Sequence, residues 1–347
     1  KIKIKMENNK VFTALELITN EVTEMPCLFG NIIPKVGLCG VVGCSESGKS
    51  LFLRQLCISV ATENEFIGLE NKCTRFKALF VSTEDGVAST SFLMKKQNEY
   101  FHIQDHHAER IRFLFSPNNP IESIRQALDE DKVDVVVVDS FSDILDGKDE
   151  KSASDIRLLM REYQKISEEY ECLIIFLHHI SKRSEFNAPN KNSVIGSQSF
   201  EAKCRLVLEL RDDNADANVR HLCILKGNYI GKEEKQESYD LYLNDSLVFE
   251  PSNTRTPLAM LSISKQSKNS KSPNNIPDKV HSDFIKSIFM NNFKPLSGAE
   301  IKRAVIEYFT VGDTLSRQYL EYYRTKKLII VDREGGNRTT FKMPTTD

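Results

Sequence analysis

The stretch that most constrains this chain is Gly43-Cys-Ser-Glu-Ser-Gly-Lys-Ser50, which directly follows the apolar segment Val36–Val42. Its two glycines let the backbone curl until several N–H groups face one point, and the helix predicted from Leu51 adds the positive end of its dipole. Backbone N–H groups, a lysine and a serine at this spacing form a cradle for phosphate. A glycine-rich turn without a ligand would not explain the Lys49-Ser50 pair. The stretch therefore predicts a Walker A nucleotide site.

The nucleotide predicted at this site is ATP, bound together with Mg²⁺. We expect the ammonium of Lys49 to reach the β- and γ-phosphates and the hydroxyl of Ser50 to bind the metal ion. The expected nucleotide-binding residues are those of the cradle and the residue after it: Gly43, Cys44, Ser45, Glu46, Ser47, Gly48, Lys49, Ser50 and Leu51.

Two acidic residues that follow apolar segments are candidates for the catalytic chemistry. Asp139 ends Val133–Asp139, and a carboxylate at the carboxyl end of a parallel strand would meet the Mg²⁺ as a Walker B aspartate. Glu84 follows Ala78–Ser82 and is the expected general base, which takes a proton from the attacking water, with Asp85 as the second choice. The alternatives are a helix cap or a turn for Asp139 and a solvated acidic loop for Glu84.

Strongly apolar segments alternate with helical patterns along the front of the chain. The segments are nearly continuous in Val, Ile, Leu and Phe, which is typical of parallel strands buried on both faces. Four such strands are predicted first, and a later meander is expected to extend the sheet. The first four are Val36–Val42, Ala78–Ser82, Val133–Asp139 and Cys172–Leu177, and the later ones are Arg205–Leu210, His221–Leu225 and a pair within Tyr239–Phe249. The predicted fold class is α/β with a mainly parallel central sheet.

The net charge of -2 gives no overall attraction to nucleic acid or membrane. Its distribution is uneven: from Ser252 onward there are 16 Lys and Arg against 9 Asp and Glu, a balance of +7, which leaves 31 against 40, or -9, for the rest. A basic tail favours a polyanionic partner. No signal peptide or apolar run of about 18 residues is visible, and the 8 cysteines include no C-x-x-C pair. We therefore expect a cytoplasmic protein that does not span a membrane.

The composition changes to Ser, Asn, Lys and Pro at Ser252, which predicts a flexible linker over residues 252–278. Three helical patterns and a β-hairpin then predict a small winged-helix-like domain over residues 279–347. Ser297-Gly-Ala-Glu300 has the pattern of a capping box for the second helix, and Asp313 or Thr314 is expected to cap the third. The candidate DNA-binding residues here are Arg317, Arg324, Lys326 and Lys327. The domain would bind duplex DNA or, alternatively, dock an initiator or loader protein.

Two groups of histidines have a possible metal interpretation. His178 and His179 end an apolar strand, but neighbouring strand residues point to opposite faces, so both rings cannot easily bind one ion. His102, His106 and His107 are expected to form a surface cluster, because no cysteine or carboxylate is spaced to complete a site there.

Taken in order, these motifs resemble the RepA-like branch of the RecA-fold ATPases, hexameric replicative helicases of plasmids that are related to the DnaB-type helicases. The resemblance covers roughly Leu28 to Val248. The Walker motifs are generic, so the discriminating elements lie downstream. These elements are His178-His-Ile-Ser-Lys182, Gly196-Ser-Gln-Ser199, Arg205 and Leu225-Lys-Gly-Asn-Tyr229. One departure is Val194-Ile195, which replaces the arginine that usually precedes the Gly-Ser element. A second is the winged helix, which the small plasmid helicases do not need.

The resemblance implies an N-terminal segment of residues 1–27 and a RecA-like core over residues 28–251. It further implies that this core hydrolyses ATP as a homo-oligomeric ring, which in the family is a hexamer. It implies that His179 is the sensor that couples the γ-phosphate to the DNA-binding loops. Arg205 would be an arginine finger supplied to the neighbouring subunit, and Lys226 would also reach that neighbour's phosphate.

Single-stranded DNA would meet a channel loop at residues 181–193. An ordinary disordered loop fits the same composition. The candidate DNA-binding residues of this loop are Lys182, Arg183 and Lys191.

The favoured function is an ATP-dependent DNA helicase or translocase in the replication of a plasmid or mobile element. A second interpretation is an ATP-switched DNA-binding regulator or assembly scaffold, in which the nucleotide changes the oligomeric state without unwinding. A recombinase filament fits the downstream motifs less well. Strand displacement on a forked duplex distinguishes the first two interpretations.

Overall fold

The computed structural model describes residues 11–145, 152–180, 187–190, 198–262, 272–290, 294–332 and 339–344. Contacts divide the chain into two compact units, Lys1–Ile263 and Ser264–Asp347, each of which is described by itself. Within the described ranges, no helix is long and apolar enough to cross a membrane.

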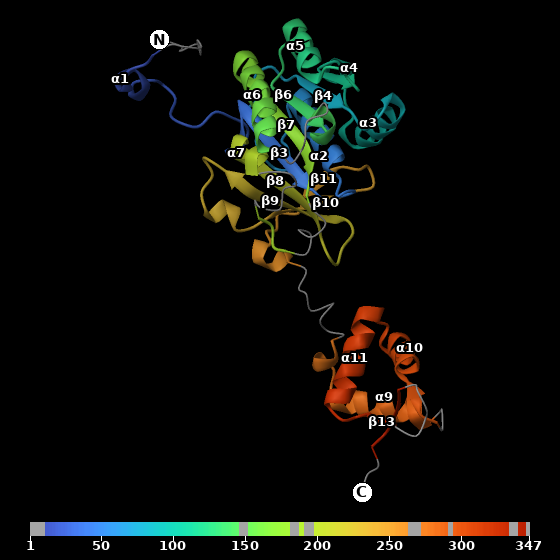
Figure 1. Cartoon of the computed structure of the whole chain (residues 1–347). Coiled ribbons are helices and arrows are strands. Elements are labelled where there is room, and N and C mark those ends of the chain that lie inside the picture. Colours follow the sequence, from blue (N-terminus) through green and yellow to red (C-terminus); the bar gives the residue numbers. More distant parts are fainter. Residues whose placement is uncertain are drawn as a thin grey trace. The chain divides into compact units, whose positions relative to one another are not determined.

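The first unit is built on a nine-stranded sheet, counted over the described residues, in the order β11-β10-β9-β8-β3-β7-β6-β4-β5 (Figure 1). The strands from β8 to β5 in that order pair in parallel, and β9, β10 and β11 continue the sheet in antiparallel pairing. This confirms the predicted α/β class. The strand bounds are β3 Gly37–Gly43, β4 Ala78–Ser82, β5 Ile111–Phe115, β6 Val135–Asp139, β7 Leu173–His179, β8 Leu206–Asp212, β9 Val219–Gly227, β10 Tyr239–Leu243 and β11 Phe249–Pro251, and a separate hairpin pairs β1 Cys27–Phe29 with β2 Ile33–Pro34.

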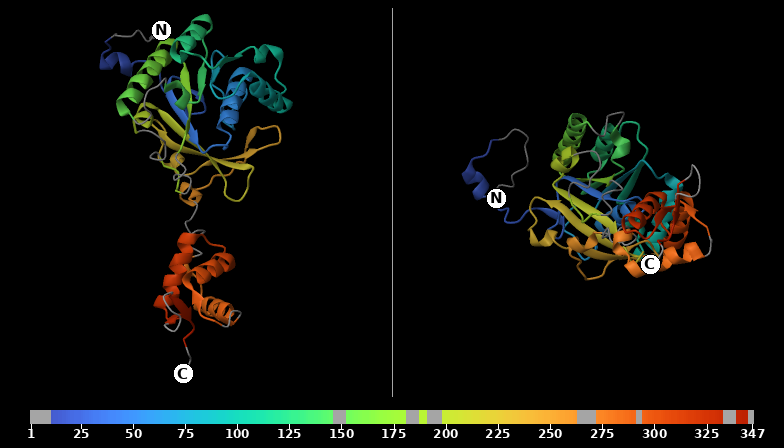
Figure 2. Two further views of the ribbon diagram at one scale, coloured as in Figure 1. Left: turned by 45° about the vertical axis from the view of Figure 1, so that its right-hand side comes forward. Right: turned by 60° about the horizontal axis from the view of Figure 1, so that its bottom comes forward.

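Helices cover both faces of the large sheet, as the two views of Figure 2 show. Residues of α2 and α3 pack in one hydrophobic cluster, and residues of α5 and α6 pack in a second cluster on the other face. Along β6, Val137 belongs to the first cluster, and Val136 and Val138 belong to the second. The nearly continuous apolar pattern therefore follows from burial on both faces. The helix bounds are α1 Ala14–Ile18, α2 Lys49–Thr62, α3 Val87–Phe101, α4 Asp105–Ala108, α5 Pro120–Glu130, α6 Ala153–Tyr170 and α7 Gln198–Lys203, with short 3-10 turns at Ser142–Leu145, Glu233–Lys235 and Leu258–Leu261.

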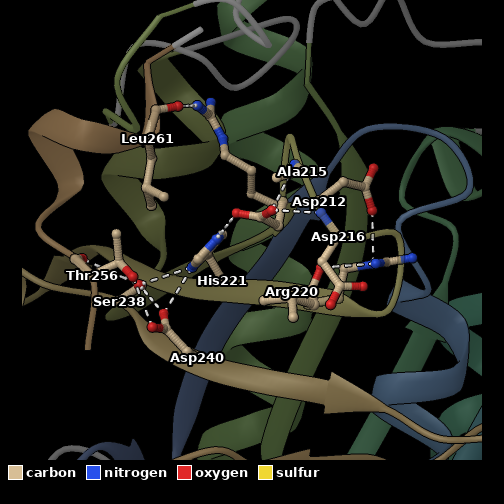
Figure 3. Close-up of polar contacts among 12 residues, drawn as sticks. Asp212, Ala215, Asp216, Arg220, His221, Ser238, Asp240, Thr256 and Leu261 are labelled. Atoms are coloured by element: carbon tan, nitrogen blue, oxygen red, sulfur yellow. Dashed lines mark hydrogen bonds and ion pairs between the residues drawn. The ribbon is translucent and has the colours of Figure 1, made fainter. Parts of the chain in front are cut away.

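Residues 252–262, the first part of the predicted linker, are bonded to the sheet of the first unit. The hydroxyl of Ser252 donates to the carbonyl oxygen of Asp240 at 2.8 Å, and the hydroxyl of Thr256 donates to the Asp240 carboxylate at 2.7 Å. Leu261 is buried, and its carbonyl accepts a hydrogen bond from an arginine of β8 (Figure 3). The prediction was wrong for residues 252–262, because the hydroxyl groups that made this stretch resemble a linker donate hydrogen bonds to Asp240, a buried aspartate of the core.

The second unit has its own hydrophobic core and a three-stranded antiparallel sheet in the order β12-β14-β13. Its elements are a 3-10 turn at Pro273–Asn275, α9 Asp278–Met290, β12 Leu296–Ser297, α10 Gly298–Phe309, α11 Asp313–Thr325, β13 Ile330–Asp332 and β14 Thr340–Lys342. The predicted capping box is present, with the Ser297 hydroxyl accepting from the Glu300 N–H and the Glu300 carboxylate accepting from the Ser297 N–H. The prediction for the third helix was wrong, because Gly312 is its N-cap and makes no side-chain cap.

Candidate active site

The Gly43–Ser50 turn joins the carboxyl end of β3 to the first residues of α2, as its sequence predicts. Gly48 is the N-cap of α2 in the left-handed region, at φ 90°. A Cβ atom on Gly43 would lie 2.3 Å from the carbonyl oxygen of Leu210 in the adjacent strand, so no larger residue fits there. The Lys49 ammonium is buried under this turn and donates to the carbonyl oxygen of Cys44. The turn thus has the curled backbone and the buried lysine of a phosphate cradle.

Glu46 occupies an unfavourable backbone position in this turn. Its φ is 70°, a region that glycine enters without the steric cost that a Cβ atom imposes. We expect Glu46→Gly to raise the free energy of unfolding of the first unit by roughly 0.5–1 kcal/mol, after allowance for the extra freedom of glycine in the unfolded chain.

Thermal unfolding of the first unit without nucleotide measures this difference, which should move the midpoint upward by about 1–4 °C. Glu46→Ala is the matched control, because it removes the same carboxylate but keeps the Cβ atom. An equal gain from both variants would show that charge, and not backbone conformation, sets the cost.

Asp139 lies at the carboxyl end of β6, and its charge acts on Lys49 of the cradle. Burial raises the pKa of Asp139 to about 6, and a hydrogen bond from the Ser50 hydroxyl opposes this rise. Its Oδ1 atom is buried without a hydrogen-bond partner among the residues that the structure describes. Burial also lowers the pKa of Lys49, whereas the charge of Asp139 raises it. An unpartnered carboxylate oxygen beside a serine hydroxyl is an oxygen donor set that fits Mg²⁺.

Glu84 follows β4, the strand next to β6, so the parallel register brings it to the same edge of the sheet. Its carboxylate Oε1 lies 3.9 Å from Nε2 of His179, the last residue of β7. The turn that carries Glu84 is fixed to the Asp139 strand, because the N–H and the hydroxyl of Thr83 both donate to the Asp139 carbonyl oxygen at 2.7 Å. His178, by contrast, is buried against the rings of Phe141 and Phe200. The two histidine rings therefore do not meet at one point.

Arg205 and Lys226 lie at the other end of the strands, where the parallel strand β8 begins. The Arg205 N–H donates to the carbonyl oxygen of Leu38, near the start of β3, whereas the cradle follows the end of this seven-residue strand. Because a strand rises about 3.3 Å per residue, the two ends are roughly 20 Å apart. Lys226 pairs with Glu201 at 3.3 Å. Neither cation can reach a nucleotide in the cradle of its own chain.

The channel-loop candidates Lys182, Arg183 and Lys191 lie outside the described residues. No group of three or more His, Cys, Asp and Glu suited to a metal ion occurs in the described part of the chain. His102 and His106 are exposed, and the ring centroids of His106 and His107 lie 3.9 Å apart, which confirms the predicted surface position of these histidines.

The structure adds residues that the sequence did not indicate. Arg220 of β9 donates from Nε to the carbonyl oxygen of Ser47 in the cradle at 3.2 Å and pairs with Asp212 at 2.7 Å. Figure 3 shows Arg220 and Asp212 side by side. Arg220 and Ser47 are 173 positions apart, so no local pattern could have joined them. The antiparallel strands therefore support the nucleotide cradle.

A buried histidine braces the same antiparallel strands. Nδ1 of His221 lies 2.7 Å from Oδ1 of Asp240 (Figure 3). Nε2 of His221 lies 3.0 Å from Oδ2 of Asp213. The hydrogen bond with His221 is the main cause that lowers the pKa of Asp213 to about 2. This bridge joins β9, which carries Arg220, to β10 and to the turn after β8.

The fold and the site together define a P-loop nucleotide-binding protein. A family model described as an AAA domain matches residues 10–185, which is just over half of the chain. The chain therefore belongs to the AAA-domain family of P-loop ATPases. No curated protein matches the sequence.

Proposed function

We propose that this chain is an ATP-driven DNA translocase of the RepA-like type, which unwinds DNA as a ring of identical subunits. The observation that carries this proposal is the distance between the predicted catalytic residues and Arg205 within one chain. The cradle, Asp139 and Glu84 occupy one edge of the sheet, and Arg205 occupies the other. A ring in which each subunit presents its Arg205 edge to the next subunit's cradle would complete every site.

The chemistry proposed for this site is the transfer of the γ-phosphoryl group to water. Lys49 and the cradle N–H groups bind and orient the phosphates, and Glu84 accepts a proton from the attacking water. Ser50 and Asp139 would hold Mg²⁺, which neutralises phosphate charge when bound. His179 lies near Glu84 and is followed by the candidate channel loop at residues 181–193. Its proposed role is to pass the state of the γ-phosphate to that loop.

Strand displacement on a forked duplex with ATP tests this proposal. We expect the wild-type chain to release a labelled strand and the Lys49→Ala variant to release none, because this variant loses the side-chain cation that binds the phosphates. Particle mass with a non-hydrolysable ATP analogue, with and without single-stranded DNA, reports the ring. ATP hydrolysis and assembly without strand release would instead favour the nucleotide-switched regulator or scaffold.

The second unit is proposed to be a winged helix that binds duplex DNA. Its separate core favours independent folding. Arg317 and Arg324 are exposed on α11, in pairs with Asp313 at 2.7 Å and with Glu321 at 3.1 Å. Such exposed pairs are weak, so phosphates can compete for both arginines. Lys326 and Lys327 follow the helix without a compensating acid in the adjoining sequence.

We expect the isolated unit, residues 264–347, to bind duplex DNA with an affinity that falls steeply with salt. Arg324→Ala with Lys327→Ala should weaken binding and reduce the log-log salt slope by about two, since each phosphate contact contributes about 0.9. Fluorescence anisotropy at several salt concentrations measures both quantities. Lys286→Ala on α9 is the matched control, because it removes an exposed cation from a different helix. A folded unit without salt-sensitive affinity for any duplex would instead be a protein-docking module.

A further inference from the structure

Arg54 is a fully buried cation in the middle of α2. Its exposed fraction is 0%, and none of its three guanidinium nitrogens has a hydrogen-bond partner in the described part of the chain. A guanidinium has five N–H donors, and burying it with none of them bonded is strongly unfavourable. Most of the buried positions of α2 around it are apolar, as at Leu53 and Leu56, although Gln55 beside it is polar and buried too. An apolar residue at position 54 would avoid this penalty, so the charge itself needs an explanation.

The carboxylate nearest to Arg54 belongs to Asp85. One terminal nitrogen of Arg54 lies 3.8 Å from Oδ2 of Asp85, and the guanidinium lies over the ring of Phe80 at 5.6 Å from its centroid. Burial lowers the pKa of Arg54, and the charges of Asp85 and Asp139 oppose this effect. Arg54 also follows Ser50 by four residues, which places it one helical turn deeper on α2 than the proposed metal-binding serine.

Asp85 is the residue after Glu84, in the turn between β4 and α3. Before Glu84, Thr83 is bonded to the Asp139 carbonyl oxygen. After Glu84, the carbonyl oxygen of Asp85 accepts from the Ser82 hydroxyl at 2.9 Å, and the Asp85 carboxylate faces Arg54. The Arg54–Asp85 pair therefore connects the turn of Glu84 to α2, the helix that follows the phosphate cradle.

We propose that Arg54 is a positioning residue, whose guanidinium holds the Asp85 carboxylate and thereby orients Glu84 toward the phosphate site. The contact also argues for Glu84 over Asp85 as the base, because the Asp85 carboxylate faces Arg54, whereas the Glu84 carboxylate lies beside His179. This inference rests on the proposed role of Glu84 in ATP hydrolysis. It does not depend on DNA unwinding.

Steady-state ATP hydrolysis and equilibrium nucleotide binding by the full chain test the proposal. Arg54→Met keeps the length of the side chain without its charge, and Asp85→Asn removes the partner's charge at a partly exposed position. We expect each variant to lower kcat about tenfold, with the Kd for a fluorescent ATP analogue changed less than twofold. The double variant should be no slower than either single variant, because both act through one contact. Arg54→Lys should recover part of the loss.

The decisive comparison uses the Glu84→Gln background. If Arg54 acts by orienting Glu84, Arg54→Met should not lower the residual turnover of Glu84→Gln further. Unchanged kcat in Asp85→Asn, multiplicative losses in the double variant, or a full tenfold loss in the Glu84→Gln background would each overturn the proposal. Wild-type turnover in Glu84→Gln itself would overturn the assignment of the base instead. Failure of strand displacement with normal hydrolysis would leave the role of Arg54 intact, so the two failures are distinguishable.

Discussion

Glu84→Gln should lower the ATP turnover of this chain by roughly 10²–10⁴-fold, the range that a general base contributes, while nucleotide binding is preserved. Glutamine keeps the size of the side chain but cannot accept a proton from water at neutral pH. The carboxylate lies outside the Gly43–Ser50 cradle and 3.9 Å from His179, so its loss removes no phosphate contact that the cradle makes. The kcat at saturating ATP and the Kd of a fluorescent ATP analogue separate the two effects.

Asp85→Asn is the matched control for Glu84→Gln, because the two carboxylates are adjacent in one turn. The Asp85 carboxylate faces Arg54, whereas Glu84 faces His179, so the smaller loss is expected from Asp85→Asn. Wild-type turnover in Glu84→Gln, together with a loss of 10² or more in Asp85→Asn, would exchange the two assignments.

The sequence predicts the parts of this site that lie at strand ends. Lys49, Glu84 and Asp139 each follow an apolar segment, and strands buried on both faces keep that pattern visible. Parallel pairing then brings their carboxyl ends to one edge. β5 was not predicted, because Arg112 interrupts its apolar pattern. The structure explains this residue, since the strand lies at the edge of the sheet and the Arg112 guanidinium donates to the carbonyl oxygens of Ala127 and Asp131.

The residues that support the site could not be predicted from local patterns. Arg54 looks like a polar residue on an amphipathic helix until its burial and its contact with Asp85 are known. Arg220 supports the cradle from a strand that pairs only after the chain has folded back on itself. Such contacts depend on tertiary structure, and the burial of Arg54 contradicts the usual preference of arginine for the surface.

Arg205→Ala should bind ATP with near wild-type affinity but hydrolyse it 10³–10⁵-fold more slowly, the range assigned to an arginine finger. The reason is geometric. Arg205 lies near the start of β3 and the cradle lies after its end, so the guanidinium cannot serve the phosphates of its own chain. Arg205 lines one pocket together with Asn228 and Tyr229. Lys203→Ala, an exposed cation nearby on α7, is the matched control and should hydrolyse ATP normally.

Mixing two inactive variants tests whether Arg205 acts on a neighbouring subunit. Arg205→Ala protein has an intact Glu84, and Glu84→Gln protein has an intact Arg205. A mixed ring contains interfaces at which a subunit with an intact Glu84 meets a subunit with an intact Arg205. At equal mixing, chance places both intact residues at one interface in four. We therefore expect hydrolysis to recover to as much as about a quarter of the wild-type rate. Native mass spectrometry confirms that the rings are mixed. Absence of recovery across mixing ratios in confirmed mixed rings would assign Arg205 a structural role at the start of β8, and the ring proposal would lose its main support.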